Sequence, residues 1–365
     1  MSSLTPSGGW VVISDYPRWP SPYFAELERH TPAGFPLAFA STLDALPTHP
    51  TQPGVINVHR LKRLYRGVDG ERTLAAAKTM VERLSALRDG GWRIVWTVHN
   101  LLPIDGGPPS DADWHAALGV LGVADTVLTH TCSDAAYLAR LTKAPVVVAG
   151  WAGLSAPATA GPAPEPVRAL VDRLRAAPYA VLIVGNLTAY KDLPNVAGAF
   201  AAHTRRARLL IAGPCRDMAL VADIEAAARG SGGRVHVHPH RIPPEHVHRL
   251  YRAADVALCP YRIDGPWRFF AQVLFPGSVS TALAFGCPVI APDLPAIGEM
   301  TAGYPARLYP ADGPGQVLAD AEVLPHSRDR RPMLDGNARW RAIADTYQRI
   351  FTQLTITRGS TCPTP

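Results

Sequence analysis

Two segments in the second half of the sequence carry residue types that could hold an anion. In the first, an apolar run ends at Gly185 and Asn186, and Lys191 follows shortly after. Glycine lets the backbone approach a ligand closely, and a lysine beside it can neutralise a phosphate as a point charge. Alone, this pattern is equally consistent with an ordinary loop that carries a solvated lysine.

The second segment places small polar residues at the start of an expected helix. After a Pro-Gly turn the residues are Gly277, Ser278, Val279, Ser280 and Thr281. The first N–H groups of a helix lack carbonyl partners and lie at the positive end of its dipole, so they attract anions. A serine that only caps the helix would give the same pattern. Together the two segments suggest a pyrophosphate, and therefore a nucleotide-linked donor.

Polar residues also end the short apolar runs of the first half. Four of these runs end at Asp15, His59, His99 and His130. The carboxyl ends of parallel strands form the ligand crevice of an α/β sheet, so these side chains are expected at one edge.

No group of residues has the spacing of a metal site. Five histidines lie close together in sequence, at His236, His238, His240, His246 and His248, but nothing completes a zinc ligand set. The five cysteines are scattered and contain no CxxC pair, which argues against a disulfide framework and favours a reducing compartment. We expect a cytoplasmic protein that requires no metal or other cofactor.

The elements that must position these residues alternate between apolar strands and amphipathic helices. Apolar runs occupy 9–15, 55–59, 93–99, 126–130 and 146–148 in the first half, and 179–185, 208–213, 235–237, 255–259 and 288–291 in the second. Helices are expected at 73–88 and at about 192–204, 217–229, 244–253 and 278–286. This alternation predicts βαβ units and two doubly wound parallel sheets.

A stretch rich in Pro, Ala and Gly separates the two halves. It covers residues 151–166 and is interpreted as a linker between domains at 1–150 and 167–336. A last helical stretch is expected over 337–354, and the final region, 337–365, comprises this helix and a tail.

Composition excludes several classes of protein. Of 365 residues, 47% are hydrophobic and 18% charged, which suits a folded chain of two domains. No apolar run approaches the ~20 residues of a spanning helix, and the N-terminus lacks the features of a signal peptide. The net charge is +6 and no tract of five or more like charges occurs, so a nucleic-acid-binding tail is not indicated. A small anionic ligand would suit this charge, and so would the absence of any charged partner.

Several motifs resemble those of GT-B glycosyltransferases, in the broad class typified by glycosyltransferase family four. Their "GxxxxYK" loop is matched by Gly185, Tyr190 and Lys191, their "ADvxxlPYr" stretch lies within 243–262, and their "AxxxGxPViA" pattern lies within 282–291. In the first half, residues 96–103 are similar to "wTvHNllP", and 21–27 resemble the first acceptor-side loop. The resemblance implies two Rossmann-like domains that face each other across a cleft. It also implies that the first domain binds the acceptor and the second the donor, and that the final helix packs back on the first domain.

The chain departs from that family's usual pattern at four places. The E-x7-E carboxylates of retaining members fall on Val273 and Thr281, and the loop arginine is Thr188. The "HG" that often closes the first domain is Gly150-Trp151. The remaining pattern is closer to a bacterial subgroup that includes polysaccharide and natural-product glycosyltransferases, some of them inverting. Donor identity and anomeric outcome are left open.

The resemblance also implies roles for individual residues. It assigns the donor diphosphate to Gly185, Asn186, Lys191 and residues 277–281, and the nucleoside to Arg241, Ile242, Tyr261 and Arg262. Sugar or acceptor contacts fall to Asp15, Tyr23, Asn100, Arg268 and Glu299. An inverting transfer needs a general base, for which His99 and Asp105 are candidates, whereas in a retaining reaction the departing phosphate can take the proton.

The expected function is therefore transfer of a sugar from a nucleoside diphosphate sugar, with UDP favoured, to a small natural-product or glycan acceptor. The alternatives are a GT-B-shaped epimerase or phosphorylase and a non-catalytic partner subunit. We expect a monomer or homodimer without a strong membrane anchor.

Overall fold

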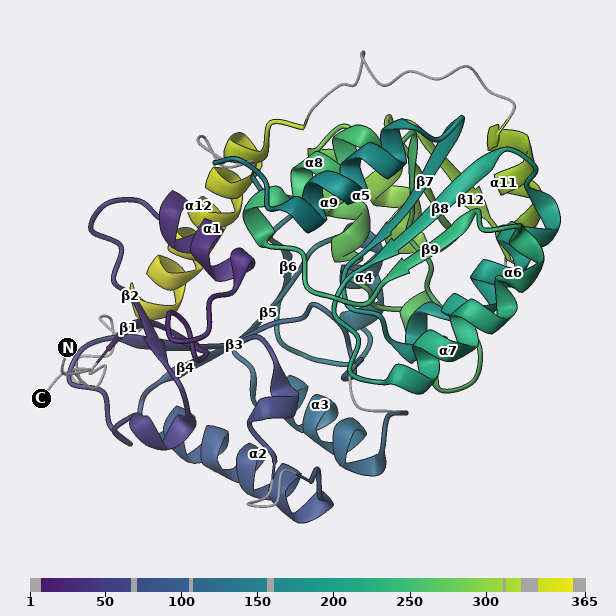
Figure 1. Cartoon of the computed structure of the whole chain (residues 1–365). Helices are drawn as coiled ribbons and strands as arrows, with labels where there is room; N and C mark the ends of the chain where they lie inside the picture. The colour runs from purple at the N-terminus through teal and green to yellow at the C-terminus, as the bar shows by residue number, and fades with distance from the viewer. Residues whose placement is uncertain are drawn as a thin grey trace, which may run out of the picture. The chain divides into compact units, whose positions relative to one another are not determined.

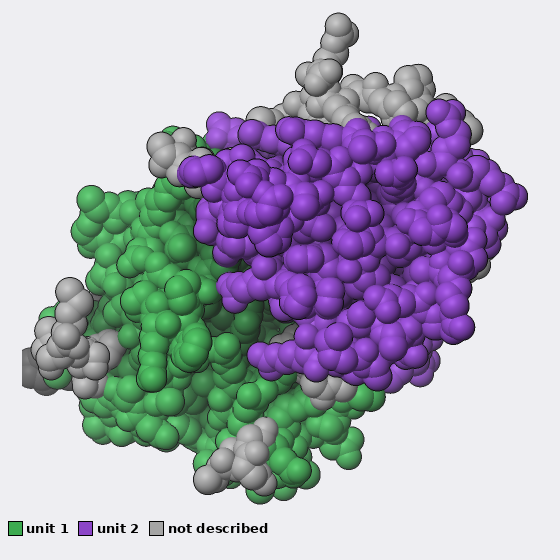
Figure 2. All heavy atoms as spheres, in the orientation of Figure 1, with its two compact units in different colours: residues 1–151, 272–275, 337–365 green, residues 152–271, 276–336 purple. Residues whose placement is uncertain are grey.

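The computed structural model describes residues 8–66, 71–104, 108–155, 161–310, 313–322 and 334–356. The chain forms two compact units, coloured separately in Figure 2. Unit 1 comprises Met1–Trp151, Gln272–Phe275 and Asn337–Pro365, and unit 2 comprises Ala152–Ala271 and Pro276–Gly336. Neither unit is one continuous segment of the chain.

Unit 1 is built on a parallel sheet in the order β2-β1-β3-β4-β5-β6. Its strands are β1 (Gly9–Ile13), β2 (Leu37–Ala40), β3 (Gly54–Val58), β4 (Arg93–Thr97), β5 (Thr126–Thr129) and β6 (Val146–Val148). Every residue of β1, β3 and β5 is buried. Because helices cover both faces of such a sheet, its central strands appear in the sequence as continuous apolar runs.

The helices of unit 1 lie on both faces of this sheet. They are α1 (Pro22–His30), α2 (Leu74–Asp89), α3 (Asp111–Val123), α4 (Cys132–Leu138) and α12 (Gly336–Ile356). In Figure 1, α2 and α3 lie on one side of the sheet and α1 and α12 on the other. The ring of Tyr347 in α12 stacks on Trp10 of β1 with centroids 5.1 Å apart. The end of the chain therefore contributes to the core of unit 1.

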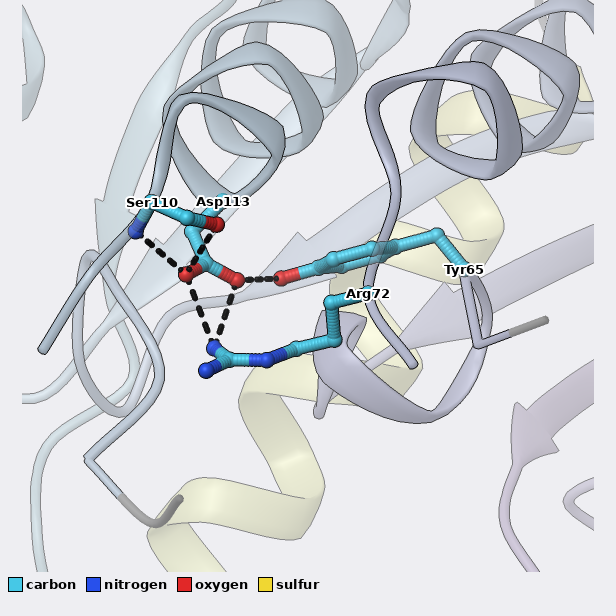
Figure 3. Close-up of polar contacts among 4 residues, drawn as sticks. All are labelled: Tyr65, Arg72, Ser110 and Asp113. Carbon is cyan, nitrogen blue, oxygen red and sulfur yellow. Dashed lines mark hydrogen bonds and ion pairs between the residues drawn. The ribbon is translucent and has the colours of Figure 1, made fainter. Parts of the chain in front are cut away.

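A buried carboxylate fixes the start of α3 (Figure 3). Asp113 accepts hydrogen bonds from the Tyr65 hydroxyl at 2.5 Å and from the Arg72 guanidinium at 2.8 Å. It also accepts from the backbone N–H and hydroxyl of Ser110, the residue that precedes the helix. Burial and this contact raise the pKa of Tyr65. Three segments of unit 1 are thus joined at one side chain.

Unit 2 repeats the architecture with the sheet order β12-β11-β10-β7-β8-β9, again parallel. The strands are β7 (Tyr179–Val184), β8 (Ala207–Ala212), β9 (Val235–His238), β10 (Val256–Leu258), β11 (Val289–Pro292) and β12 (Ala306–Tyr309). Apolar residues of β7 and β8 pack on α6 in a core that includes Val181, Leu209 and Phe200.

The helices of unit 2 are α5 (Glu165–Arg175), α6 (Leu193–His203), α7 (Met218–Ala227), α8 (Val247–Ala253), α9 (Gly277–Ala284), α10 (Pro295–Thr301) and α11 (Gly315–Glu322). Figure 1 shows α5, α8 and α9 on one face of the sheet, and α6, α7 and α11 on the other. In the described residues of the chain, no helix combines the length and the hydrophobicity that a membrane crossing requires.

The prediction of two doubly wound α/β units is confirmed, although the sequence did not indicate every element. Strands β2 and β12 were not expected. Both lie at sheet edges and are mostly only half-buried, so neither carries a long apolar run. The helix expected over 244–253 begins with a 3₁₀ turn, Pro244–His246, and becomes α-helical only at Val247. The stretch interpreted as a linker is buried at Trp151–Gly153, and α5 begins at Glu165.

Candidate active site

The loop after β7 brings the backbone close to a lysine. Gly185 has φ +114°, a conformation that L side chains rarely adopt. A Cβ at this position would lie 3.4 Å from Nζ of Lys191. On the other side, a Cβ on Gly213 would lie 2.1 Å from the Gly185 carbonyl oxygen. The two glycines let the ends of β7 and β8 approach each other while Lys191 lies beside the loop.

Lys191 is a buried cation. It ends a 3₁₀ turn, Ala189–Lys191, and is only 4% exposed. Loss of hydration lowers its pKa to about 8, an effect that the nearby Cys259 thiol partly opposes. Among the described residues, no carboxylate partner of its ammonium group is found. A buried charge is costly unless it is paired, so this arrangement favours an anionic ligand.

The second anion-suited segment lies next to the same lysine. The Ser278 hydroxyl, in the first turn of α9, is 2.9 Å from the Tyr261 hydroxyl, and it partly opposes the rise in the pKa of the Cys259 thiol. Cys259 in turn interacts electrostatically with Lys191. Burial raises the pKa of Cys259 to about 11, so the thiol stays neutral. Lys191 and the start of α9 thus share Cys259 as a neighbour.

Two of the expected hydroxyl donors in α9 have other roles. The hydroxyls of Ser280 and Thr281 both donate to the Gly277 carbonyl, at 3.0 and 2.7 Å. The Ser280 N–H donates to the Pro276 carbonyl, so the earlier N–H groups, of Gly277, Ser278 and Val279, have no carbonyl within the helix. The anion-binding capacity of α9 therefore lies in its backbone and not in these hydroxyls.

Aromatic rings hold the Lys191 loop in place. The rings of Tyr190 and Tyr261 stack with centroids 5.9 Å apart, and Trp267 and Phe270 contact Tyr190 at their edges. The Arg262 N–H donates to the Tyr190 carbonyl at 2.8 Å. These contacts join the turn that carries Lys191 to the segment after β10.

The other donor-side candidates are more exposed. The Arg262 side chain pairs with Asp264 at the surface, and Arg268 is exposed on the 3₁₀ helix Gly265–Ala271. Arg241 is exposed after β9 while Ile242 beside it is buried. Exposed positions are also found for two further candidates, Asn186 and Glu299.

In unit 1, three histidines meet at the carboxyl edge of the sheet. His59, His99 and His130 follow β3, β4 and β5, which are neighbours in the sheet. His59 Nδ1 lies 3.0 Å from His99 Nε2, and His99 Nδ1 lies 2.9 Å from His130 Nε2. Burial lowers the pKa of His59 to about 3 and of His130 to about 4. The pKa of His99 is lowered well below its usual value, by burial first and then by the two other rings and Arg60.

Tyr23 and Asn100 lie beside this histidine cluster. The Tyr23 ring from α1 meets His99 edge to face at 5.0 Å, and its hydroxyl is 3.1 Å from that of Tyr347. Asn100 has a buried Oδ1 without a hydrogen-bond partner among the described residues, an acceptor open to a ligand hydroxyl. Asp15 instead pairs with Arg63 at 2.5 Å. Asp105 lies outside the described residues.

Sequence reasoning overlooked some residues of the cluster. Asn57 accepts from His59, and Phe275 stacks near His130 with centroids 4.1 Å apart. Asn57 lies inside a buried strand, where a polar residue is a signal that could have been used. Phe275 belongs to a short segment far away in sequence, and nothing local indicates its place.

The comparison with protein families finds a match in the second unit. Residues 178–322 match the family model of glycosyl transferases group 1. The matched residues cover most of unit 2. The prediction of a glycosyltransferase is confirmed by this match. No curated protein matches the chain at a significant level.

Solved structures confirm the GT-B fold. A trehalose-phosphate synthase (UDP-forming) from Burkholderia xenovorans, in complex with glucose-6-phosphate, is 16% identical with a TM-score of 0.57 and covers 85% of this chain and 74% of its own. HepE of Anabaena, in complex with UDP and glucose, is 14% identical with a TM-score of 0.51 and covers 95% and 87%. AviGT4, a glycosyltransferase involved in avilamycin A biosynthesis, is 16% identical with a TM-score of 0.54 and covers 96% and 98%. At these identities the likeness establishes the fold.

Proposed function

We propose that this glycosyltransferase transfers a sugar from a nucleoside diphosphate sugar, with UDP as the nucleotide, to a small natural-product or glycan acceptor. The observation that carries the proposal is the buried Lys191 beside Gly185, whose ammonium group has no carboxylate partner in the part of the chain that the structure describes. A diphosphate would supply the negative charge that this site lacks. The structures of similar fold with UDP or a UDP-forming activity support the choice of nucleotide.

The chemistry of the proposed step follows from this placement. As the bond between the sugar and the diphosphate breaks, negative charge builds on the departing phosphate. Lys191 and the backbone N–H groups of Gly277 and Val279 are fixed donors for that charge, and fixed donors stabilise a transition state without reorganisation. We propose that they perform the role that a metal ion has in other glycosyltransferases, so the reaction needs no added metal.

Acceptor binding is proposed for the carboxyl edge of the sheet in unit 1. Asn100 offers a buried carbonyl oxygen that has no hydrogen-bond partner among the described residues, and Tyr23 offers an aromatic face near His99. Sugars and polyols bind through hydroxyl contacts of this kind, combined with packing on aromatic rings. An uncharged, hydroxyl-bearing acceptor therefore suits these residues best.

The test is a donor screen on the purified full-length chain. Thermal shifts with UDP, GDP and dTDP identify the nucleotide, and release of that nucleotide is then followed by mass spectrometry with a panel of acceptors. We expect UDP to raise the melting temperature and UDP release to require an acceptor. Stabilisation by none of the three nucleotides would overturn the proposal. Nucleotide-sugar conversion without any acceptor would instead support an epimerase.

A further inference from the structure

A cavity of about 560 Å³ lies between α5 and α8 of unit 2 and shares no lining residue with the Lys191 site. Figure 1 shows these two helices on the same face of the sheet. Both helices contribute arginines to the lining, namely Arg168 and Arg175 from α5 and Arg249 and Arg252 from α8. Among the described residues that line the cavity, Asp172 is the one that is acidic. The cavity is therefore strongly basic.

Helical spacing directs these arginines to one groove. Arg168 and Arg175 are separated by seven positions of α5, and Arg249 and Arg252 by three positions of α8. Residues with such separations lie on the same side of a helix. Like charges that gather in this way repel one another, so the cluster adds nothing to the stability of the fold.

Nearby carboxylates neutralise the cluster only in part. The exposed Glu165 pairs with Arg168 across one turn of α5, and Asp172 lines the cavity between the arginines of that helix. With both carboxylates counted against the four arginines, two positive charges remain in excess. A ligand that carries two negative charges would balance them.

One of the arginines is already oriented by the backbone. A terminal nitrogen of Arg249, Nη2, donates to the Gly161 carbonyl at 2.8 Å, and the residue is half-buried. A guanidinium holds five N–H donors in a planar fork that matches two oxygens of a phosphate group. Because the backbone bond fixes this fork, less rotational freedom is lost when an anion binds.

His248 responds to the positive charge in the cavity. It lines the cavity and is only 8% exposed. Burial lowers its pKa most, Arg252 and Arg249 lower it further, and the Glu245 carbonyl partly opposes this change. An anion beside these arginines would offset their charge and raise the pKa of His248. The histidine is therefore a reporter for an occupant of the cavity.

Apolar walls and the size of the cavity indicate that its ligand is larger than a phosphate group. Ala163 and Val171 are both buried and line the cavity together with the arginines. Its volume of about 560 Å³ is typical of sites that hold a small molecule. There is room for a compact uncharged part, such as a sugar ring or a nucleoside, beside the charged groups.

We propose that the cavity between α5 and α8 is a second anion-binding site, for a small molecule that carries at least two negative charges on phosphate groups. Arg168 and Arg252 bind the phosphates from the two helices, and the oriented fork of Arg249 binds between them. The site does not depend on the proposed sugar transfer, because none of its residues belongs to the Lys191 site.

The test measures the binding of inorganic pyrophosphate to the full chain. All variants carry Lys191→Met, so that the proposed diphosphate site does not contribute. Isothermal titration calorimetry compares the pair Arg168→Gln/Arg252→Gln with the pair Arg206→Gln/Arg229→Gln. Each pair removes two charges at exposed positions of unit 2, and only the first pair lines the cavity. We expect the first pair to raise the dissociation constant by at least about tenfold and the control pair to leave it nearly unchanged.

Nuclear magnetic resonance with isotope-labelled histidine locates the bound pyrophosphate. The resonances of His248, assigned with the His248→Gln variant, should shift and its pKa should rise, while those of the exposed His203 should stay in place. No binding of pyrophosphate, equal affinities of the two arginine pairs, or unshifted His248 resonances would overturn the proposal.

Vesicles distinguish a free phosphorylated molecule from a lipid headgroup. The same variants are mixed with vesicles of phosphatidylcholine that contain or lack phosphatidic acid. We expect pyrophosphate binding to need Arg168 and Arg252 and vesicle binding to be absent. Vesicle binding that needs both phosphatidic acid and these two arginines, without binding of pyrophosphate, would assign the cavity to a membrane surface and overturn the proposal.

Discussion

At the scale of single residues, Lys191 shows how a proposed binding group can cost stability. It is the basic residue that the sequence placed in a phosphate loop, and the structure buries it without a carboxylate partner among the described residues. Its pKa of about 8 is lower than usual because the folded state disfavours the charged form. At neutral pH the folded protein therefore carries a buried charge that the unfolded chain would keep hydrated.

Lys191→Met should stabilise the unliganded protein and remove nucleotide binding. At pH 7 we expect the free energy of unfolding to rise by at most about 3 kcal/mol, since each pKa unit corresponds to about 1.4 kcal/mol. This gain in the free energy of unfolding should decrease from about pH 8 upwards and be lost by about pH 10.5. Over that range the folded wild-type protein holds a neutral lysine, so folding no longer buries a charge and costs only the release of one proton. Urea unfolding at several pH values measures the difference in unfolding free energy. Lys143→Met, at an exposed lysine, is the control. A destabilised variant would contradict it.

Nucleotide affinity should also depend on pH through Lys191. The charged ammonium group binds the diphosphate, and in the free enzyme this group loses its proton as the pH rises through about 8. The dissociation constant for UDP should therefore increase above pH 8, by up to about tenfold per pH unit. Isothermal titration calorimetry between pH 6.5 and 9.5 measures how the dissociation constant for UDP changes with pH. A flat profile in the wild type would exclude Lys191 from the diphosphate site.

At the scale of elements, the ends of parallel strands and the first turns of helices carry the chemistry. Apolar runs alone were enough to predict β3, β4 and β5, and their neighbouring positions bring His59, His99 and His130 together. Edge strands β2 and β12 lack such runs and were missed. The hydrogen-bond pattern of the histidines depends on the orientation of Asn57 and on the Gly150 carbonyl, which only the assembled sheet determines. Local sequence could indicate the residues but not their protonation.

The Asp113 side chain at the start of α3 holds Tyr65, Arg72 and Ser110 together, and its contribution to stability can be tested. Asp113→Ala should lower the free energy of unfolding of unit 1 by about 3–5 kcal/mol, because it leaves the half-buried Arg72, the buried Tyr65 hydroxyl and the Ser110 N–H without their acceptor. Asp111→Ala changes an exposed carboxylate in the same helical turn and should have little effect. Denaturant unfolding of both variants measures the difference. Similar midpoints for the two would show that the network contributes little.

At the scale of the whole molecule, the last helix belongs to the first unit. Trp340 in α12 is 1% exposed and meets Tyr23 edge to face at 5.0 Å. This placement of the final helix was implied by the family resemblance and not by any local pattern. The place of the short segment Gln272–Phe275 in unit 1 was indicated by neither, because its backbone bonds residues far away in sequence, Asp134 and His99.

Trp340→Ala should weaken unit 1 and leave the proposed nucleotide site of unit 2 intact. Loss of the large buried ring should cost about 3–5 kcal/mol in the free energy of unfolding. UDP should still raise the melting temperature of the variant by nearly the wild-type amount, since Lys191 and α9 lie in the other unit. Differential scanning calorimetry with and without UDP measures both effects, and Arg341→Ala at the neighbouring exposed position is the control. Loss of the UDP shift would show that the two units depend on each other for binding.

The segment Gln272–Phe275 interrupts unit 2 and belongs to unit 1. Its backbone donates to the His99 carbonyl at 2.7 Å and to the Asp134 carboxylate at 3.2 Å, and Gly277 of α9 follows two residues later. Anyone who builds chimeras by exchanging donor modules between such enzymes must therefore cut the gene at four places. If 152–336 is replaced as one block, residues 272–275 of unit 1 are replaced as well. The recipient's histidine cluster would then contact four residues from the other enzyme.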